Sequence, residues 1–130
     1  MHGVQLFGDK VAIVGGTGLT SDAVDTVVLY DIKRNCCQTL APLPYAVSSM
    51  ATFALGDSII MIGGWDKTDG DELNSVVSYN VEKQKSKMLP STKQRRACSA
   101  AVVTDDVIVV MGEWEKNDYL DSVECFNFYT

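Results

Sequence analysis

Side chains that could perform chemistry are few in this chain of 130 residues. His2 is the single histidine, and the four cysteines, Cys36, Cys37, Cys98 and Cys125, show no Cys-x-x-Cys spacing. Zinc sites, copper sites and Cys–His nucleophiles all need more partners than this set supplies. We therefore expect no catalytic residue, no bound metal and no cofactor. The protein is expected not to be an enzyme.

The cysteines also bear on the compartment. Cys98 and Cys125 lie inside apolar runs, where a cysteine can serve as a small buried hydrophobe. The N-terminus lacks the basic start and long apolar core of a secretory signal. We therefore expect reduced, structural thiols in a cytoplasmic protein.

A possible phosphate loop occurs early in the chain. Gly16-x-Gly18 follows the apolar run Val11–Val14, like the opening of a dinucleotide-binding motif. That motif requires a helix whose N-terminal amides hold the pyrophosphate. Here the next segment, Asp25–Asp31, has the β-branched composition of a strand. We therefore do not expect nucleotide binding.

The acidic segment Asp66–Glu72 resembles a calcium loop. Aligning Gly70 with the sixth position of such a loop places Trp65 and Lys67 where oxygen ligands belong. The residues present therefore predict a solvated acidic loop.

A basic cluster stands out in a chain whose formal net charge is −6. Arg95 and Arg96 follow four lysines, Lys83, Lys85, Lys87 and Lys93. Guanidinium groups pair bidentately with carboxylates or phosphates. A solvated loop and a partner-binding site both fit the cluster, and Arg96 is the strongest candidate for the second interpretation. The acidic balance gives no reason to expect nucleic acid, and no apolar run is long enough to span a bilayer.

The elements that must position these side chains are repeated. Gly15-Gly16, Gly63-Gly64 and Gly112-Glu113 each follow a short apolar run, and their first glycines are 48 and 49 residues apart. Self-similarity at such a period indicates a repeat architecture. Glycine fits there because it adopts positive φ and allows close backbone approach.

Each glycine pair is followed by a β-branched segment that ends in an aromatic residue and an Asp or Asn. The three aromatic residues are Tyr30, Tyr79 and Phe126. With the tight turns Gly8-Asp9, Gly56-Asp57 and Asp105-Asp106, the pattern predicts short antiparallel strands and no helix. Strands are expected near 2–7, 10–15, 24–31, 35–40, 48–54, 58–63, 74–81, 84–89, 97–103, 107–112 and 121–128.

Four antiparallel strands in about 48 residues describe one blade of a β-propeller. At this point the chain resembles the Kelch repeat, with its Gly-Gly after an apolar strand and its later Tyr-Asp pair. The resemblance implies an all-β, Kelch-type propeller fragment with blades over about 1–46, 47–95 and, in part, 96–130. Cys37 and Ser86 stand where the repeat has tryptophan, and Glu113 replaces a glycine.

The resemblance to Kelch propellers implies a closed ring of five to seven blades. The units in this sequence are too few to complete such a ring alone. An open arc exposes apolar faces at both ends. The end of the sequence before a further fourth strand favours a piece of a longer protein. Assembly with further copies and a soluble open arc are the alternatives.

In such a blade, one end gathers the second-to-third loops and the connections between blades. We call this end the loop face; it comprises residues 17–23, 41–47, 65–72, 90–96 and 113–119. Binding usually resides in loops on a rigid scaffold. The candidate partner-binding residues are Tyr45, Trp65, Lys67, Asp69, Arg95, Arg96, Trp114 and Tyr119. Trp65 and Trp114 occupy matching positions and fit packing between blades equally well.

The resemblance implies a protein-interaction module with a protein or peptide bound on the loop face. The repeat spacing and Leu40-Ala-Pro-Leu-Pro44 look most like the BTB–Kelch family, whose propellers capture substrates for cullin-RING ubiquitin ligases. A ligase would be reached through regions outside this chain. An actin-binding Kelch scaffold and a Kelch-type sugar oxidase or mutarotase are the alternatives.

Overall fold

The computed structural model describes residues 2–66, 71–112, 114–115, 118–119 and 121–127. Every regular element within these ranges is a strand, and every pairing between strands is antiparallel. The expected all-β class is confirmed. Among the described residues, no helix has the length and apolar character needed to cross a membrane.

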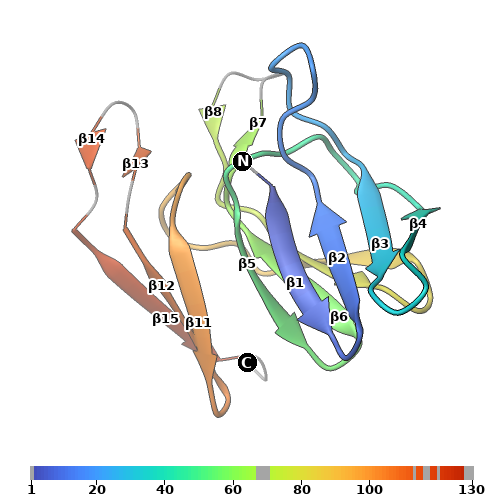
Figure 1. The fold of residues 1–130 in the computed structure, drawn as a ribbon. Coiled ribbons are helices and arrows are strands. Elements are labelled where there is room, and N and C mark those ends of the chain that lie inside the picture. Colours follow the sequence, from blue (N-terminus) through green and yellow to red (C-terminus); the bar gives the residue numbers. More distant parts are fainter. Residues whose placement is uncertain (1, 67–70, 113, 116–117, 120, 128–130) are drawn as a thin grey trace.

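Three sheets follow one another along the chain (Figure 1). The first contains β1 (Gly3–Phe7), β2 (Lys10–Val14), β3 (Val27–Asp31) and β4 (Cys36–Leu40), in that order. The second contains β5 (Ala51–Leu55), β6 (Ser58–Ile62), β9 (Val76–Asn80) and β10 (Lys85–Leu89). The third, in the described residues, contains β11 (Ala100–Thr104), β12 (Val107–Met111) and β15 (Val123–Asn127).

Tight turns join the first two strands of each sheet. Their first residues, Gly8, Gly56 and Asp105, have φ values of 58°, 57° and 49°. Glycine reaches this left-handed region without a steric cost, and aspartate is one of the few other residues that tolerate it. The expected hairpins are therefore confirmed, and each predicted strand lies within three residues of its observed bounds.

The sheets pack face to face as an open arc. β5 lies beside β1 on one side and β11 on the other, so the first strands of the three sheets line the inside of the arc (Figure 1). The described sheets do not close into a ring. This arrangement matches successive blades of a propeller.

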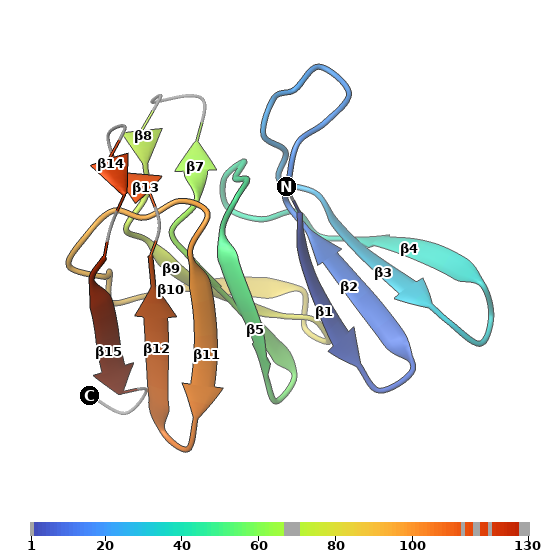
Figure 2. The ribbon, with the colours of Figure 1, turned by 60° about the vertical axis from the view of Figure 1, so that its left-hand side comes forward.

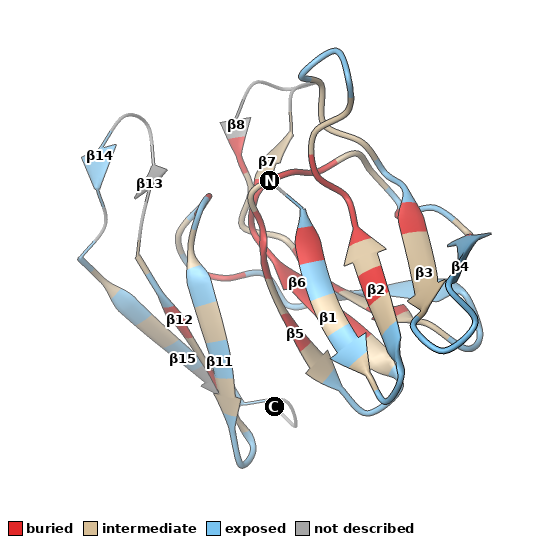
Figure 3. Cartoon of the chain, viewed as in Figure 1, coloured by how far each residue is buried: buried red, intermediate tan, exposed pale blue. Residues whose placement is uncertain are grey.

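Two hydrophobic cores hold the arc together, and β6 contributes to both. Ile59 and Met61 face the core shared with the first sheet, whereas Ile60 and Ile62 face the core shared with the third. Alternate side chains of a strand point to opposite faces, which explains this division. The buried residues accordingly concentrate in and around the second sheet (Figure 3).

Candidate functional site

Two short ribbons rise from the loop face. β7 (Trp65–Asp66) pairs with β8 (Asp71–Glu72), and β13 (Trp114–Glu115) pairs with β14 (Asp118–Tyr119). A single bridge between Thr17 and Ala23 makes the same pairing in the first sheet. The ribbons and the 17–23 loop project from the same end of the sheets (Figure 2). The three second-to-third connections therefore share one construction.

The glycine pairs set the direction of these connections. Gly15 and Gly63 have φ values of 56° and 62°, and Gly16 and Gly64 have values of 100° and 104°. Gly112, at the same point of the third sheet, has a φ of 62°. A Cβ atom at Gly63 would collide with the Arg96 carbonyl oxygen, and one at Gly16 would collide with the His2 ring.

The same glycines also tie each sheet to the connection that leads to the next one. The Gly16 amide donates to the Val47 carbonyl over 2.8 Å, and the Gly64 amide donates to the Arg96 carbonyl over 2.7 Å. Val47 and Arg96 therefore occupy equivalent positions in successive units. Their side chains, however, differ completely in chemistry.

Arg96 lies inside the molecule, with 0% of its surface exposed. Its Nε donates to Glu124 Oε2 over 3.0 Å, and its Nη1 donates to the carbonyls of Gly112 and Ser122 over 2.8 and 3.2 Å. Its Nη2 donates to Gln94 Oε1 and Ser122 Oγ over 3.1 and 2.9 Å. These contacts use all five N–H donors of a guanidinium.

The expectation that Arg96 contacts a partner is corrected by this geometry. A buried side chain without a spare donor cannot present its guanidinium to a carboxylate from outside. Through these hydrogen bonds, Arg96 instead attaches the 90–96 connection to the third sheet. Glu124 strengthens this attachment, because its Oε1 accepts from the Lys93 amide over 2.7 Å and its Oε2 accepts from the Gln94 amide over 3.3 Å.

Tyr45 has a comparable place between the first and second sheets. Its hydroxyl lies 2.7 Å from Ser75 Oγ, and the ring packs against the first hydrophobic core. Burial raises the pKa of Tyr45. In the next unit, Ser122 Oγ donates to Gln94 Oε1, so a polar side chain of the connection again meets a serine at the start of a third strand.

The repeated aromatic residues serve the sheets in different ways. The Tyr79 hydroxyl donates to the Ala41 carbonyl over 2.7 Å, and the tyrosine is fully buried. Burial raises the pKa of Tyr79. The Tyr30 hydroxyl instead donates to Asn35 Oδ1 within its own turn. The side chain of Phe126 lies outside the described residues.

The other candidate partner-binding residues stay on the loop face where they are described. Trp65 is half-buried, and its backbone bonds to Ser48 in both directions, over 2.8 and 3.1 Å. Arg95 is exposed, and its Nη1 donates to the Glu72 carbonyl over 3.1 Å. Tyr119 is exposed at the end of β14. Lys67, Asp69 and the side chain of Trp114 lie outside the described residues.

The acidic segment Asp66–Glu72 lies in part outside the described residues. The Gly16-x-Gly18 motif that suggested a nucleotide site lies within them. Residues 17–23 turn back through the Gly18 and Asp22 backbones instead of starting a helix, and β3 follows. The Gly16-x-Gly18 segment is therefore a loop of the repeat. Among the described residues, no group of three His, Cys, Asp or Glu side chains is placed to hold a metal ion.

The expectation that Cys98 and Cys125 are buried is wrong. All four cysteines are free and exposed. Cys98 has a φ of 54° in the connection before β11, where its amide donates to Ser49. Cys125 lies on β15, next to the inward-facing Glu124 in sequence, so it occupies the opposite face of that strand.

Glu124 and Leu19 were not recognised from the sequence. Aligning the third strands on Tyr79 and Phe126 pairs Val77 with Glu124, and aligning the units on Gly63 and Gly112 pairs Val47 with Arg96. Two apolar positions therefore become opposite charges in the same unit. That paired change was the available signal for a contact. Leu19 is fully exposed at the tip of the 17–23 loop, and an exposed leucine in such a loop had no comparable pattern to mark it.

Comparison with known families agrees with the repeated geometry. The Kelch motif model matches residues 46–93 and 95–130. No curated protein matches the chain. Kelch repeats generally mediate protein–protein interactions. Because the matched segments cover well over half of the sequence and coincide with the second and third sheets, the chain belongs to the Kelch motif family.

Proposed function

We propose that this chain is a non-enzymatic module that binds a protein partner through its loop face. The observation that carries the proposal is the shared construction of three neighbouring second-to-third connections at one end of the arc. Rigid sheets hold these loops side by side, which lets one partner contact several of them (Figure 2). Kelch membership supports the same class of function.

The exposed side chains on this face suit a protein surface. Leu19 and Tyr119 present large apolar area from the first and third sheets, and Arg95 adds a cation at the 90–96 connection. Aromatic residues and arginine are enriched among the side chains that dominate binding energies. The proposed contact set therefore spans the arc instead of resting on one loop.

The more specific role that we propose is substrate capture for a cullin-RING ubiquitin ligase in the cytoplasm. The repeat spacing of 48–49 residues and the sequence at Leu40–Pro44 support likeness to BTB–Kelch propellers. The ligase would bind regions outside this chain.

Affinity capture from cells of the type that expresses the protein naturally tests both proposals, partner binding through the loop face and the ligase role. The test variant combines Leu19→Asp with Tyr119→Asp, and the control combines Ile32→Asp with Met88→Asp, two exposed residues away from the loop face. We expect the test variant to recover its protein partners at least tenfold less well, because losing a hot-spot side chain such as a tyrosine costs about 2 kcal/mol or more. The control should recover them normally.

Equal recovery by both variants would exclude the loop face as the binding surface. The same precipitates are probed for a cullin. Its presence with wild type and with both variants supports the ligase role, because recruitment would not use the loop face. Its consistent absence overturns that role and leaves the partner-binding result to stand or fall separately.

A further inference from the structure

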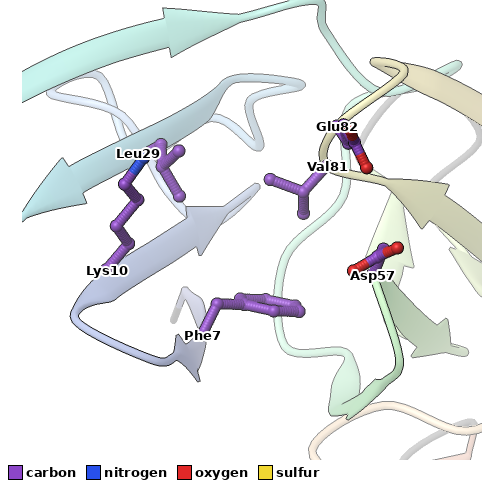
Figure 4. A pocket seen from close by; sticks show the side chains of 6 residues that line it. All are labelled: Phe7, Lys10, Leu29, Asp57, Val81 and Glu82. Atoms are coloured by element: carbon purple, nitrogen blue, oxygen red, sulfur yellow. The ribbon is translucent and has the colours of Figure 1, made fainter.

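A cavity of about 250 Å³ lies between the first and second sheets, at the end opposite to the loop face. Its lining residues are Phe7, Lys10, Leu29, Asp57, Val81 and Glu82. Phe7 and Val81 project into the space between the sheets, with Asp57 and Glu82 on one side and Lys10 on the other (Figure 4). The cavity therefore has an apolar floor and charged walls.

Asp57 and Glu82 line the same side of the cavity because their backbone segments are joined. The Val81 amide donates to the Asp57 carbonyl over 3.0 Å, which places Glu82, the next residue, at the same wall. The first sheet has the same bond, from the Ile32 amide to the Asp9 carbonyl over 3.0 Å. Asp9 and Asp57 are thus equivalent residues of the repeat.

The residue that follows this bond differs between the two units. In the first unit it is Lys33, whose Nζ lies 3.2 Å from Asp9 Oδ2. A hydrogen bond and charge attraction from Lys33 are the main causes that lower the pKa of Asp9. In the second unit the same position holds Glu82. An internal cation is therefore replaced by a second anion.

This exchange leaves two carboxylates without a cation at the wall. Within the described part of the chain, neither Asp57 nor Glu82 forms an ion pair, and Lys10 belongs to the opposite wall. Two negative charges on one side of a cavity attract a cation more strongly than one does. The charge of this wall therefore favours a positively charged ligand.

We propose that this cavity binds a lysine or arginine side chain of a protein partner. The charged end pairs with Asp57 and Glu82, and the aliphatic stem covers Val81 and the Phe7 ring. Long basic side chains combine such a stem with a charged head, and an aromatic ring adds a cation–π contribution. The cavity is smaller than the roughly 300–1,000 Å³ typical of drug-sized ligands, so it suits one side chain.

Arginine is the better probe of the two, because its planar fork pairs with carboxylates bidentately. The probe is a fluorescent hexapeptide with a central arginine between two leucines. Its matched control carries citrulline, which has nearly the same shape and no charge. We expect the citrulline peptide to bind about tenfold more weakly, since hydrogen bonds between charged groups exceed neutral ones.

Protein variants locate the binding. Glu82→Lys recreates the internal pair of the first sheet and should abolish detectable binding. Asp57→Asn with Glu82→Gln should weaken binding about tenfold, and Lys10→Met should strengthen it several-fold by removing a competing cation. The matched control is Asp105→Asn with Asp106→Asn, which removes the same charge from an exposed turn of the third sheet.

All these positions are exposed, so each variant should keep the amide spectrum of the folded chain. Equal affinity for the arginine and citrulline peptides, or unchanged binding to Glu82→Lys, would overturn the proposal. Free arginine is titrated in parallel, because tight binding of the amino acid would identify a small cation instead of a protein as the ligand. The Leu19→Asp and Tyr119→Asp variant should bind the peptide normally, which separates this site from the loop face.

Discussion

The Arg96 guanidinium lies 3.0 Å from the Glu124 carboxylate at the joint between the second and third sheets. Arg96 is fully buried, and the Glu124 side chain is 13% exposed. Between the first and second sheets, two buried valines, Val47 and Val77, occupy the equivalent positions. The same place in the repeat is therefore closed once by apolar packing and once by an ion pair.

Replacing one member of this pair should destabilise the chain strongly. Glu124→Val leaves a buried guanidinium without its anion and should cost about 3–5 kcal/mol of unfolding free energy. Arg96→Val should cost less, because Glu124 keeps the amides of Lys93 and Gln94 as donors. Urea denaturation followed by tryptophan fluorescence measures both.

The double variant Arg96→Val with Glu124→Val is the decisive comparison. It restores the valine pair of the first joint, so its loss should be smaller than that of either single variant. A double variant whose loss equals the sum of the two single losses would show that the charges do not depend on one another.

Gly63→Ala should be more costly than a similar change in a turn. Gly63 has a φ of 62°, and a Cβ there would meet the Arg96 carbonyl oxygen. Gly56 has a φ of 57° with nothing within 4 Å of the same atom. Gly56→Ala should therefore cost only the left-handed penalty of about 1–2 kcal/mol, and Gly63→Ala should exceed it.

Thermal unfolding of the two variants tests this difference. Matching losses of stability would mean that backbone conformation alone explains the repeated glycine, without the close approach to the next connection.

The strands were predictable because their signal is local. Alternating β-branched residues, tight turns and repeated glycines all lie within a few residues of the elements they specify. The ribbons were not predictable, since two-residue pairs such as Trp65–Asp66 with Asp71–Glu72 carry no periodicity. The burial of Arg96 depends on its ion pair with Glu124, 28 residues later in the sequence. The residues next to Arg96 in the sequence indicated only an exposed loop.

The prediction that Cys98 and Cys125 are buried is wrong for a related reason. An apolar run indicates a strand or the connection that leads into it, but it does not show which face a given residue occupies. Cys98 adopts a φ of 54° before β11, and this conformation decides where its side chain points. The neighbouring residues in the sequence do not encode that turn in an obvious way.

All four thiols should therefore react in the folded state. N-ethylmaleimide added under native conditions should give four adducts by intact-protein mass spectrometry, because every cysteine is exposed. Cys98→Ser and Cys125→Ser should each remove one adduct. Modification that reaches four only in urea would show that at least one thiol is buried.

The alkaline stability of the chain should depend on Tyr79. Burial raises the pKa of this tyrosine above the value of 10.0 that applies when it is exposed, so the folded state keeps the phenol proton after the unfolded state has lost it. The stabilisation is complete below about pH 10 and is lost as the pH rises through the folded value. Unfolding free energy should thus fall above pH 10.

Tyr79→Phe separates this effect from the titration of lysines, which both proteins share. The variant should be less stable at pH 8 by about 1–3 kcal/mol, because the Ala41 carbonyl loses its donor. Its stability should then fall less steeply above pH 10. Tyr45→Phe is the companion variant, since burial raises the pKa of Tyr45 as well. Urea denaturation at intervals between pH 8 and pH 11.5 measures the slopes, and parallel curves for wild type and Tyr79→Phe would show that Tyr79 does not resist ionisation in the folded chain.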